Sequence, residues 1–165
     1  MLSDGFIERL SITYNSRLYL EQSYPDHNEY LLSLFKLYEL MVTNCSKIII
    51  RKPDKRTGKI YKSIAFKTLS FRYMNEYHDI FYKNKIKIVP KNIHELLTAR
   101  SLAYCIMYDG GKSKYNKIIL QTRAFTKNDI LLLQNTLKIN FKLKWRLEEK
   151  VKNQFWVEMT SWRKS

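Results

Sequence analysis

The sequence predicts an α+β fold made of two similar units, and three observations support this prediction. Stretches with helical periodicity alternate with pairs of short stretches in which apolar and polar residues alternate, as in strands. An apolar run ends in Asp-Gly twice, at Asp4 and at Asp109. The segment Asn28–Leu32 resembles Asn128–Leu132. We therefore expect two pseudo-symmetric αββαββα-like repeats, with antiparallel saddle sheets around a pseudo-twofold axis.

The chain is long enough for one domain with a proper core, because it has 165 residues of which 45% are apolar. We assign residues 1–165 to a single domain, with pseudo-repeats at about 1–91 and about 92–165. The 30 Lys and Arg against 15 Asp and Glu give a net charge of +15. A domain this basic is typical of proteins that bind nucleic acid, and its aromatic residues could stack on bases. A basic protein that is merely soluble is the alternative.

Other classes of protein fit the sequence less well. The two cysteines, Cys45 and Cys105, form neither a disulfide framework nor a zinc site, and Cys105 is expected to be a small buried apolar residue. The chain has no run of about 20 apolar residues, so we expect no membrane partner. A composition rich in Lys, Asn, Ile and Tyr suits an AT-rich organellar genome, which predicts an organellar protein, in mitochondria rather than plastids.

The first repeat is predicted to contain two hairpins and two helices. Its strands alternate apolar and polar residues, and they are Arg9–Tyr14, Arg17–Gln22, Lys47–Arg51 and Ile60–Thr68. Its helices are one that begins at Asp26 as the N-cap and runs to Met41, and one over Ser70–Tyr82. The turn Lys52–Lys59 is crowded with positive charge. This hairpin tip could lie on phosphates or could be a solvated turn.

The second repeat is predicted to follow a basic crossing segment, Lys83–Pro90. Its strands are Lys117–Thr122, Lys142–Leu147 and Gln154–Met159. Its helices are a short one at Asn92–Leu97, a second at Leu102–Asp109 and a third at Thr126–Leu137. Thr126 and Asp129 form a start that resembles a capping box.

The predicted helix at Leu102–Asp109 contains the clearest candidate for a functional residue in the chain. It is apolar on most of its faces, so we expect it to be largely buried. The following pair Gly110 and Gly111 favours a left-handed C-terminal cap. An acid in the last turn is unfavourable because the helix macrodipole is negative there, so Asp109 is a candidate functional residue. Two helix ends that each deliver one carboxylate, Asp4 and Asp109, could hold a divalent cation between them.

The segment Leu102–Gly110 reads Leu-Ala-Tyr-Cys-Ile-Met-Tyr-Asp-Gly. It resembles the LAGLIDADG signature in its Leu-Ala-Tyr-Trp-Phe-Met-Asp-Asp-Gly variant, and Leu2–Glu8 resembles the tail of the first copy in two-repeat members. The similarity extends over nearly the whole chain. It implies the LAGLIDADG homing endonuclease fold, most like the single-chain, organellar intron-encoded enzymes. It also implies a monomer with an internal pseudo-twofold axis.

The resemblance assigns roles to three residues. Asp4 and Asp109 match the two signature acids, which would bind Mg²⁺ if the protein is catalytically competent. Lys87, three residues before Pro90, matches the basic residue of the active site. A lysine on a solvated surface is the alternative for Lys87, because several lysines stand in this stretch.

The chain also departs from the family pattern in ways that bear on cleavage. Relative to the family, it lacks the helix turns ahead of Asp4, and it lacks the terminal helix of the second repeat with the lysine symmetric to Lys87. Tyr108 replaces a residue that is commonly acidic or small. A catalytic group that is loose by about 1 Å can lose about a hundredfold in rate. If this sequence is the whole gene product, we therefore expect the cleavage chemistry to be compromised and the basic sheets to be retained.

Three hypotheses follow for function. A domesticated, non-cleaving binder of structured RNA is slightly favoured, as an organellar ribosome component with ribosomal proteins as partners or as a maturase-like intron-splicing factor. The second is an active Mg²⁺-dependent homing endonuclease that makes double-strand breaks in duplex DNA. The third, a protein-interaction module whose charge is incidental, fits least well.

The residues predicted to contact nucleic acid are basic and stand in or beside the predicted strands and turns. They are Arg9, Arg17, Arg51, Lys52, Lys55, Arg56, Lys59, Lys62, Lys85, Lys112, Lys117, Lys144 and Arg146.

Overall fold

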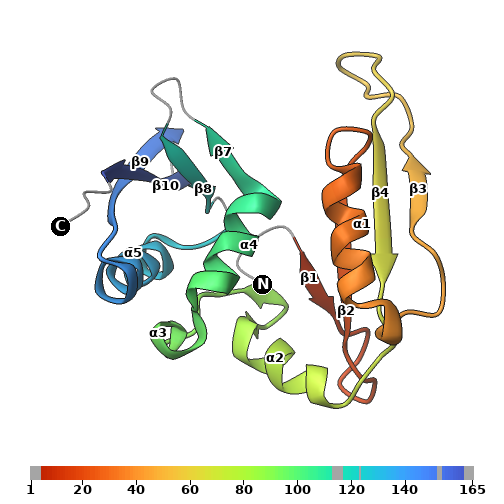
Figure 1. The fold of residues 1–165 in the computed structure, drawn as a ribbon, viewed down its shortest axis with the longest axis horizontal. Coiled ribbons are helices and arrows are strands. Elements are labelled where there is room, and N and C mark those ends of the chain that lie inside the picture. Colours follow the sequence, from red (N-terminus) through yellow and green to blue (C-terminus); the bar gives the residue numbers. More distant parts are fainter. Residues whose placement is uncertain (1–4, 113–116, 123, 152–153, 162–165) are drawn as a thin grey trace. The chain divides into compact units, whose positions relative to one another are not determined.

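The computed structural model describes residues 5–112, 117–122, 124–151 and 154–161 (Figure 1). They divide into two compact units, and the boundary between His78 and Asp79 falls inside a helix. Within the described ranges, no helix is long and apolar enough to cross a membrane.

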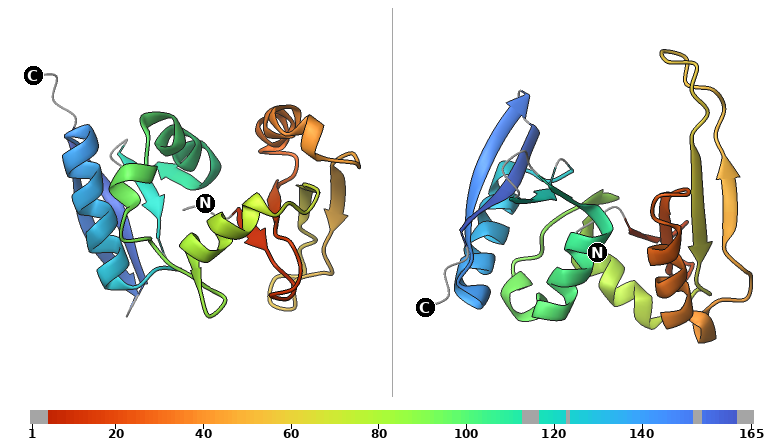
Figure 2. Two further views of the ribbon diagram at one scale, coloured as in Figure 1. Left: turned by 90° about the horizontal axis from the view of Figure 1, so that it is seen from below. Right: turned by 45° about the horizontal axis from the view of Figure 1, so that its top comes forward.

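The first unit is a four-stranded antiparallel sheet with one helix packed on it. The strands, in their order across the sheet, are β1 (Phe6–Glu8), β2 (Arg17–Ser23), β4 (Lys62–Lys67) and β3 (Lys47–Ile50). The helices are α1 (Asn28–Leu37), the 3₁₀ turn η1 (Glu39–Met41) and α2 (Tyr73–Phe81). Helix α1 contacts β2 and β4, and it lies along one side of the sheet (Figure 2). The ring of Phe35 meets Phe66 of β4 edge-on, with centroids 5.4 Å apart.

The second unit repeats this design after a short hairpin and two helices. These are β5 (Tyr82–Lys83), β6 (Ile86–Lys87), α3 (Ile93–Leu96) and α4 (Ala99–Asp109). Its sheet, in spatial order, consists of β7 (Gly110–Lys112), β8 (Ile118–Gln121), β10 (Gln154–Ser161) and β9 (Lys144–Val151). Helix α5 (Lys127–Phe141) packs on β9 and β10, and its Leu133 and Leu137 are buried in this core with Val157.

The two sheets have the same strand order, because β1-β2-β4-β3 corresponds to β7-β8-β10-β9. In both units the helix that follows the second strand covers the sheet. Leu20 of β2 and Leu120 of β8 are each buried. The predicted α+β fold with two internal repeats is confirmed.

The strand predicted at Arg9–Tyr14 is wrong, because the strand that pairs with β2 is β1, three residues earlier in the chain. Residues 9–16 instead form a loop, in which the side chain of Arg9 binds main-chain oxygens further along the same loop. The guanidinium of Arg9 donates to the carbonyl oxygens of Ile12, at 2.8 Å, and of Tyr14, at 3.1 Å. The apolar residues that produced the alternating pattern are exposed in this loop, with Ile12 at 84%.

The predicted N-cap at Asp26 is also wrong. Helix α1 begins at Asn28 after His27, whose side chain makes no capping hydrogen bond. The helix ends at Leu37, and the predicted extension to Met41 is the 3₁₀ turn η1. By contrast, the capping box of α5 is confirmed, since the Thr126 hydroxyl accepts from the amide of Asp129 at 3.2 Å and the Asp129 carboxylate accepts from the amide of Thr126 at 3.2 Å.

Candidate nucleic-acid interface

Each sheet has one face covered by a helix and one face that the helix leaves open. In the first unit, Leu18 and Leu20 point to the covered face and are buried. Alternation along β2 therefore places Arg17, Tyr19 and Glu21 on the opposite face, which we call the first open face. The strand register adds further residues to this face: Phe6 and Glu8 from β1, Ser63, Ala65 and Lys67 from β4, and Lys47 and Ile49 from β3.

Glu21 binds three neighbouring side chains in one half of the first open face. Its carboxylate accepts hydrogen bonds from the Tyr19 hydroxyl at 2.6 Å and the Ser63 hydroxyl at 2.5 Å, and it forms an ion pair with Arg51. Burial raises the pKa of Glu21, but the hydrogen bonds from Ser63, Tyr19 and Arg51 outweigh this, so its pKa lies below the usual value. Glu21 is therefore ionised at neutral pH and fixes the direction of the Arg51 side chain.

Glu8 forms ion pairs with two cations in the other half of this face. Its carboxylate lies 2.5 Å from the Arg17 guanidinium and 3.4 Å from the Lys67 ammonium. Burial raises the pKa of Glu8, but the hydrogen bond and charge of Arg17 and the charge of Lys67 lower it further than burial raises it. The Lys67 ammonium also sits 4.9 Å from the centroid of the Tyr19 ring, which is a cation–π distance. The first open face thus carries cations that are each paired with a carboxylate of the same face.

Tyr19 stands between the two carboxylates and stays protonated. Burial, the hydrogen bond to Glu21 and the negative charge of Glu21 together raise the pKa of Tyr19 to about 12. Its ring also packs against Phe6, with centroids 4.7 Å apart. The phenol is therefore a neutral part of the first open face.

The basic tip of the β3–β4 hairpin is an ordered turn. The Asp54 carboxylate accepts from the amides of Arg56, at 2.8 Å, and Thr57, at 2.9 Å, and these backbone hydrogen bonds lower the pKa of Asp54. Gly58 supplies the left-handed residue of the turn, with φ of 68°. The side chains that this turn presents are exposed and basic, namely Lys52, Lys55, Arg56 and Lys59.

The second sheet has an open face of the same kind. Leu120 and Val157 are buried on the covered face, so Ile119 and Glu158, which are paired in register, lie on the other. The Lys117 ammonium is 3.0 Å from the Glu158 carboxylate. Arg146, paired in register with Glu158, lies on the same open face, as does Lys144 by alternation along β9.

The remaining predicted contact residues fall at different places. Lys62 pairs with Ile50 in register and shares the covered face with Ile64. Arg9 closes the 9–16 loop, and Lys85 is a left-handed residue in the β5–β6 turn, with φ of 63°. Lys112 ends β7, and its side chain lies outside what the structure describes.

The sequence prediction missed Lys67 and Lys47, which the register brings onto the first open face. Lys67 was visible as the last polar residue in the alternation of its strand. Its position opposite Tyr19 depends on the pairing between β2 and β4, which no local pattern specifies.

The three predicted catalytic residues are only partly described. Asp4 lies outside the described residues, and Asp109 is the last residue of α4, with its side chain outside the description. Lys87 is half-buried in β6, paired in register with Tyr82. Among the described side chains, no group of three or more His, Cys, Asp or Glu is arranged to hold a metal ion. The predicted Mg²⁺ site therefore stays a prediction.

The end of α4 differs from the predicted left-handed cap. Gly110 is extended, with φ of −72° and ψ of 141°, and its amide donates to the carbonyl oxygen of Ile106. Glycine is required here for space, because a Cβ atom on Gly110 would lie 2.2 Å from that oxygen. The chain passes directly from helix α4 into strand β7, and this close approach fixes the backbone of Asp109 at the junction.

Helix α4 is less buried than its composition predicts. Leu102 and Tyr108 are buried, whereas Ala103 and Met107 are exposed, and Cys105 is half-buried rather than fully buried. The bulk of Tyr108, which departs from the family pattern, lies in the core.

Several known proteins are similar in sequence to this chain. Cytochrome b mRNA maturase bI2 of Debaryomyces hansenii is 33% identical over 147 residues, which cover 87% of this chain and 55% of that protein. Probable intron-encoded endonuclease 1 of Wickerhamomyces canadensis is 30% identical over 157 residues, which cover 87% of this chain and 63% of that protein. The chain thus spans a little over half the length of these relatives.

A solved structure of the homing endonuclease I-WcaI bound to its DNA recognition sequence has the same fold. Its TM-score is 0.86 at 25% sequence identity, and the match covers 96% of this chain and 70% of that one. The family model described as the LAGLIDADG DNA endonuclease family matches residues 1–163. Together with the repeated sheets and the Leu102–Gly110 signature, this match shows that the chain belongs to the LAGLIDADG DNA endonuclease family.

Proposed function

We propose that the chain binds nucleic acid through the open faces of its two sheets. The observation that carries this proposal is the first open face, where Glu8 and Glu21 hold Arg17, Arg51 and Lys67 in place on a sheet whose other side is covered. Phosphate contacts from Arg and Lys supply most of the affinity of such proteins and set their register on the polynucleotide. The net charge of +15 favours the same class of partner.

The two acids on this face support binding rather than oppose it. An exposed arginine loses side-chain freedom when it binds a phosphate, and that loss weakens association. Because Glu21 already orders Arg51 and Glu8 already orders Arg17, part of that entropy has been lost before the partner arrives. The cations can then contact phosphates at defined spacings.

Within this function we propose a maturase-like role on structured intron RNA, without cleavage, in an organelle. Support comes from the relatives named as cytochrome b mRNA maturases in Debaryomyces hansenii and in Saccharomyces cerevisiae. The relatives described here are named for introns and mRNA, so the proposal does not extend to a ribosomal role.

Cleavage of duplex DNA is the second candidate function. It is favoured by the solved relative bound to its DNA recognition sequence and by relatives named as intron-encoded endonucleases. In this case Asp4 and Asp109 would bind Mg²⁺, which supplies activation of water and stabilisation of the leaving oxygen when it is bound. Lys87 would be the accompanying basic residue.

The test of binding compares charge reversals on and off the first open face. Arg51→Glu and Lys67→Glu should each weaken binding of duplex DNA or structured RNA by about tenfold at low salt, because each removes one phosphate contact and adds a repulsive charge. Lys36→Glu, an equal charge change at an exposed position of α1, is the matched control and should change affinity by less than about twofold. Equal effects of all three variants, measured by fluorescence anisotropy, would mean that the open face is not the binding surface.

Cleavage is tested separately with duplex DNA libraries and Mg²⁺. Site-specific breaks that disappear in Asp109→Asn would establish the endonuclease and end the non-cleaving proposal. Tight, salt-sensitive RNA binding without breaks would support the maturase-like role.

A further inference from the structure

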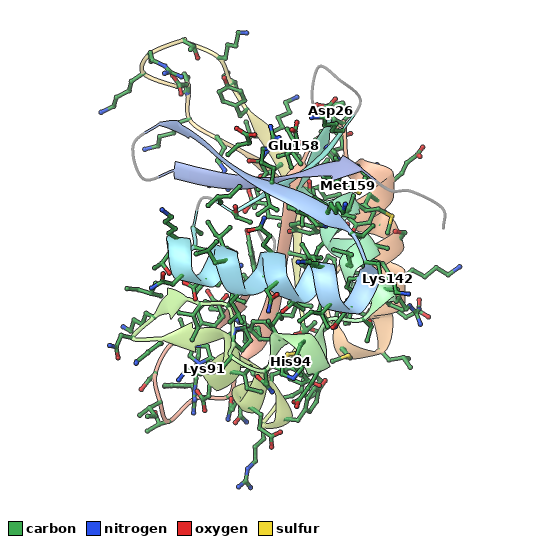
Figure 3. The ribbon with its side chains drawn as sticks, turned by 90° about the vertical axis from the view of Figure 1, so that its left-hand side faces the viewer. Asp26, Lys91, His94, Lys142, Glu158 and Met159 are labelled. Atoms are coloured by element: carbon green, nitrogen blue, oxygen red, sulfur yellow. The ribbon has the colours of Figure 1, made fainter. Side chains whose placement is uncertain are left out.

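A second candidate binding site lies in the second unit, on the helix-covered side of its sheet. A groove of about 620 Å³ runs between α5 and the edge strand β9. Figure 3 shows α5 alongside β9 and β10, with Lys142 at the C-terminal end of the helix. The groove is lined by Leu131, Gln134, Asn135 and Lys138 of α5 and by the segment Leu143–Leu147.

The lining of this α5–β9 groove is basic and amphipathic. Lys138 is the cation that α5 brings to the groove, Lys144 and Arg146 border it from the edge strand with their side chains on the open face, and none of the lining residues is an acid. Outside the lining, the carboxylate of Glu148 lies 3.7 Å from the Arg146 guanidinium, in an exposed pair of the kind that contributes little. A groove with cations at its rim and no acid in its lining fits a polyanion.

The floor of the groove offers apolar surface and hydrogen-bonding groups. Leu143 and Leu147 are half-buried, and Asn135 exposes a carboxamide. Gln134 donates to the main-chain oxygen of Trp145 at 2.5 Å, which fixes the edge of β9 against the helix. Apolar surface beside amide groups suits a base and its ribose, because amides can pair with base edges or a 2′-hydroxyl.

Trp145 provides an independent indication of a missing partner. Its side chain is buried in the groove wall, and among the described residues its indole N–H has no hydrogen-bond acceptor. A buried donor without an acceptor destabilises the folded protein. An oxygen atom from a ligand in the groove, reached after a small movement of the wall, would satisfy this donor.

We propose that the α5–β9 groove binds a single-stranded segment of RNA, independently of the open faces. The volume is that of a site for a small ligand, so it accepts one or two nucleotides and not the side of a duplex. Lys138 contacts a phosphate at the mouth of the groove, and the leucines and Asn135 contact the bases and riboses. The choice of RNA over single-stranded DNA rests on the proposed maturase-like function, whereas the polyanion site itself rests on the groove.

The test measures binding of a labelled, unstructured 12-nucleotide RNA to the full chain by fluorescence anisotropy. Lys138→Glu should weaken this binding about tenfold and leave duplex affinity within about twofold of wild type. Lys138→Gln should make the salt dependence shallower by about 0.7 in the logarithmic slope, which is the value for one lost contact to a single strand. Lys127→Glu, the same charge change on the exposed start of α5 outside the groove, is the matched control and should have little effect.

Several results would overturn the proposal. Equal losses in Lys138→Glu and Lys127→Glu would show only long-range charge, and loss of RNA binding in Arg51→Glu instead of Lys138→Glu would place the RNA on the first open face. Equal affinity for a single-stranded DNA of the same sequence would overturn the choice of RNA. Displacement of the RNA by an acidic peptide at lower concentration than by unlabelled RNA would assign the groove to a protein partner. If duplex binding resists Arg51→Glu while the groove results hold, the proposed function fails and this site stands.

Discussion

The junction at Gly110 gives the sharpest prediction for the protein. Replacing Gly110 with Ala places a Cβ atom 2.2 Å from the carbonyl oxygen of Ile106 and 3.0 Å from its carbonyl carbon. Both atoms belong to the backbone of α4, so no side-chain rotation can relieve the overlap. The last turn of the helix must move by almost 1 Å, or the chain must leave the helix in a different direction.

The cost of this change follows from two contributions. Relieving an overlap with atoms that cannot move freely costs about 1–3 kcal/mol, as when extra atoms are inserted without room. The hydrogen bond from the Gly110 amide to the Ile106 carbonyl is lost or bent, which costs about 1 kcal/mol more. A loss of about 3 kcal/mol lowers the unfolding temperature of a chain of this size by about 6–12 °C.

The neighbouring glycine provides a matched control for a thermal-unfolding measurement by circular dichroism. A Cβ atom on Gly111 would meet Gln121 at 3.5 Å and Ile119 at 3.9 Å, which are ordinary contacts. Gly111→Ala should therefore unfold within about 2 °C of wild type, or above it if the unfolded chain loses entropy. Equal unfolding temperatures for Gly110→Ala and Gly111→Ala would refute the close approach at the end of α4.

Two further predictions concern stability. The folded-state pKa of Glu21 lies below its usual value of 4.5, so the stability that its charge contributes is present above that value and is lost as the pH falls through the folded-state pKa. The difference in unfolding temperature between wild type and Glu21→Gln should thus be largest near pH 7 and shrink towards pH 3, and a constant difference would contradict the Glu21 network. Thr126→Ala should lower the free energy of unfolding by about 1 kcal/mol in urea titration, since it removes the hydroxyl that caps α5. Ser33→Ala, at an exposed position of α1 where the hydroxyl donates to the Tyr30 carbonyl oxygen, should cost less.

Local sequence patterns predicted most of the elements but not the partners of their side chains. The Thr126 capping box was predictable because Thr and Asp stand three residues apart at the start of an apolar period. The 9–16 loop was not, because Leu10 and Ile12 alternate like a strand while the hydrogen bonds of Arg9 close a loop. At Gly110, the sequence does not show why glycine is needed. The reason could be a left-handed backbone or a close approach that leaves no room for a side chain, and the structure shows the second.

The candidate site was harder to predict than the fold, because it is assembled across strands. Glu21 is on β2, but its partners Ser63 and Arg51 come from the distant β3–β4 hairpin. A list of basic residues therefore included Lys62, which the register turns to the covered face, and omitted Lys67, which it turns to the open one. One residue of uncertainty in register exchanges the two faces, so the fold can be correct while individual contact residues are not.

The two open faces share a topology but differ in charge at matching positions. In the first sheet, Tyr19 of the second strand lies between Phe6 and Lys67. In the second sheet, Ile119 of the corresponding strand lies between Gly111 and Glu158. A cation in one unit thus occupies the place of a carboxylate in the other. The two faces therefore cannot present the same charges to two identical half-sites, because the position of Lys67 holds a cation in the first sheet and, in the second, a carboxylate paired with Lys117.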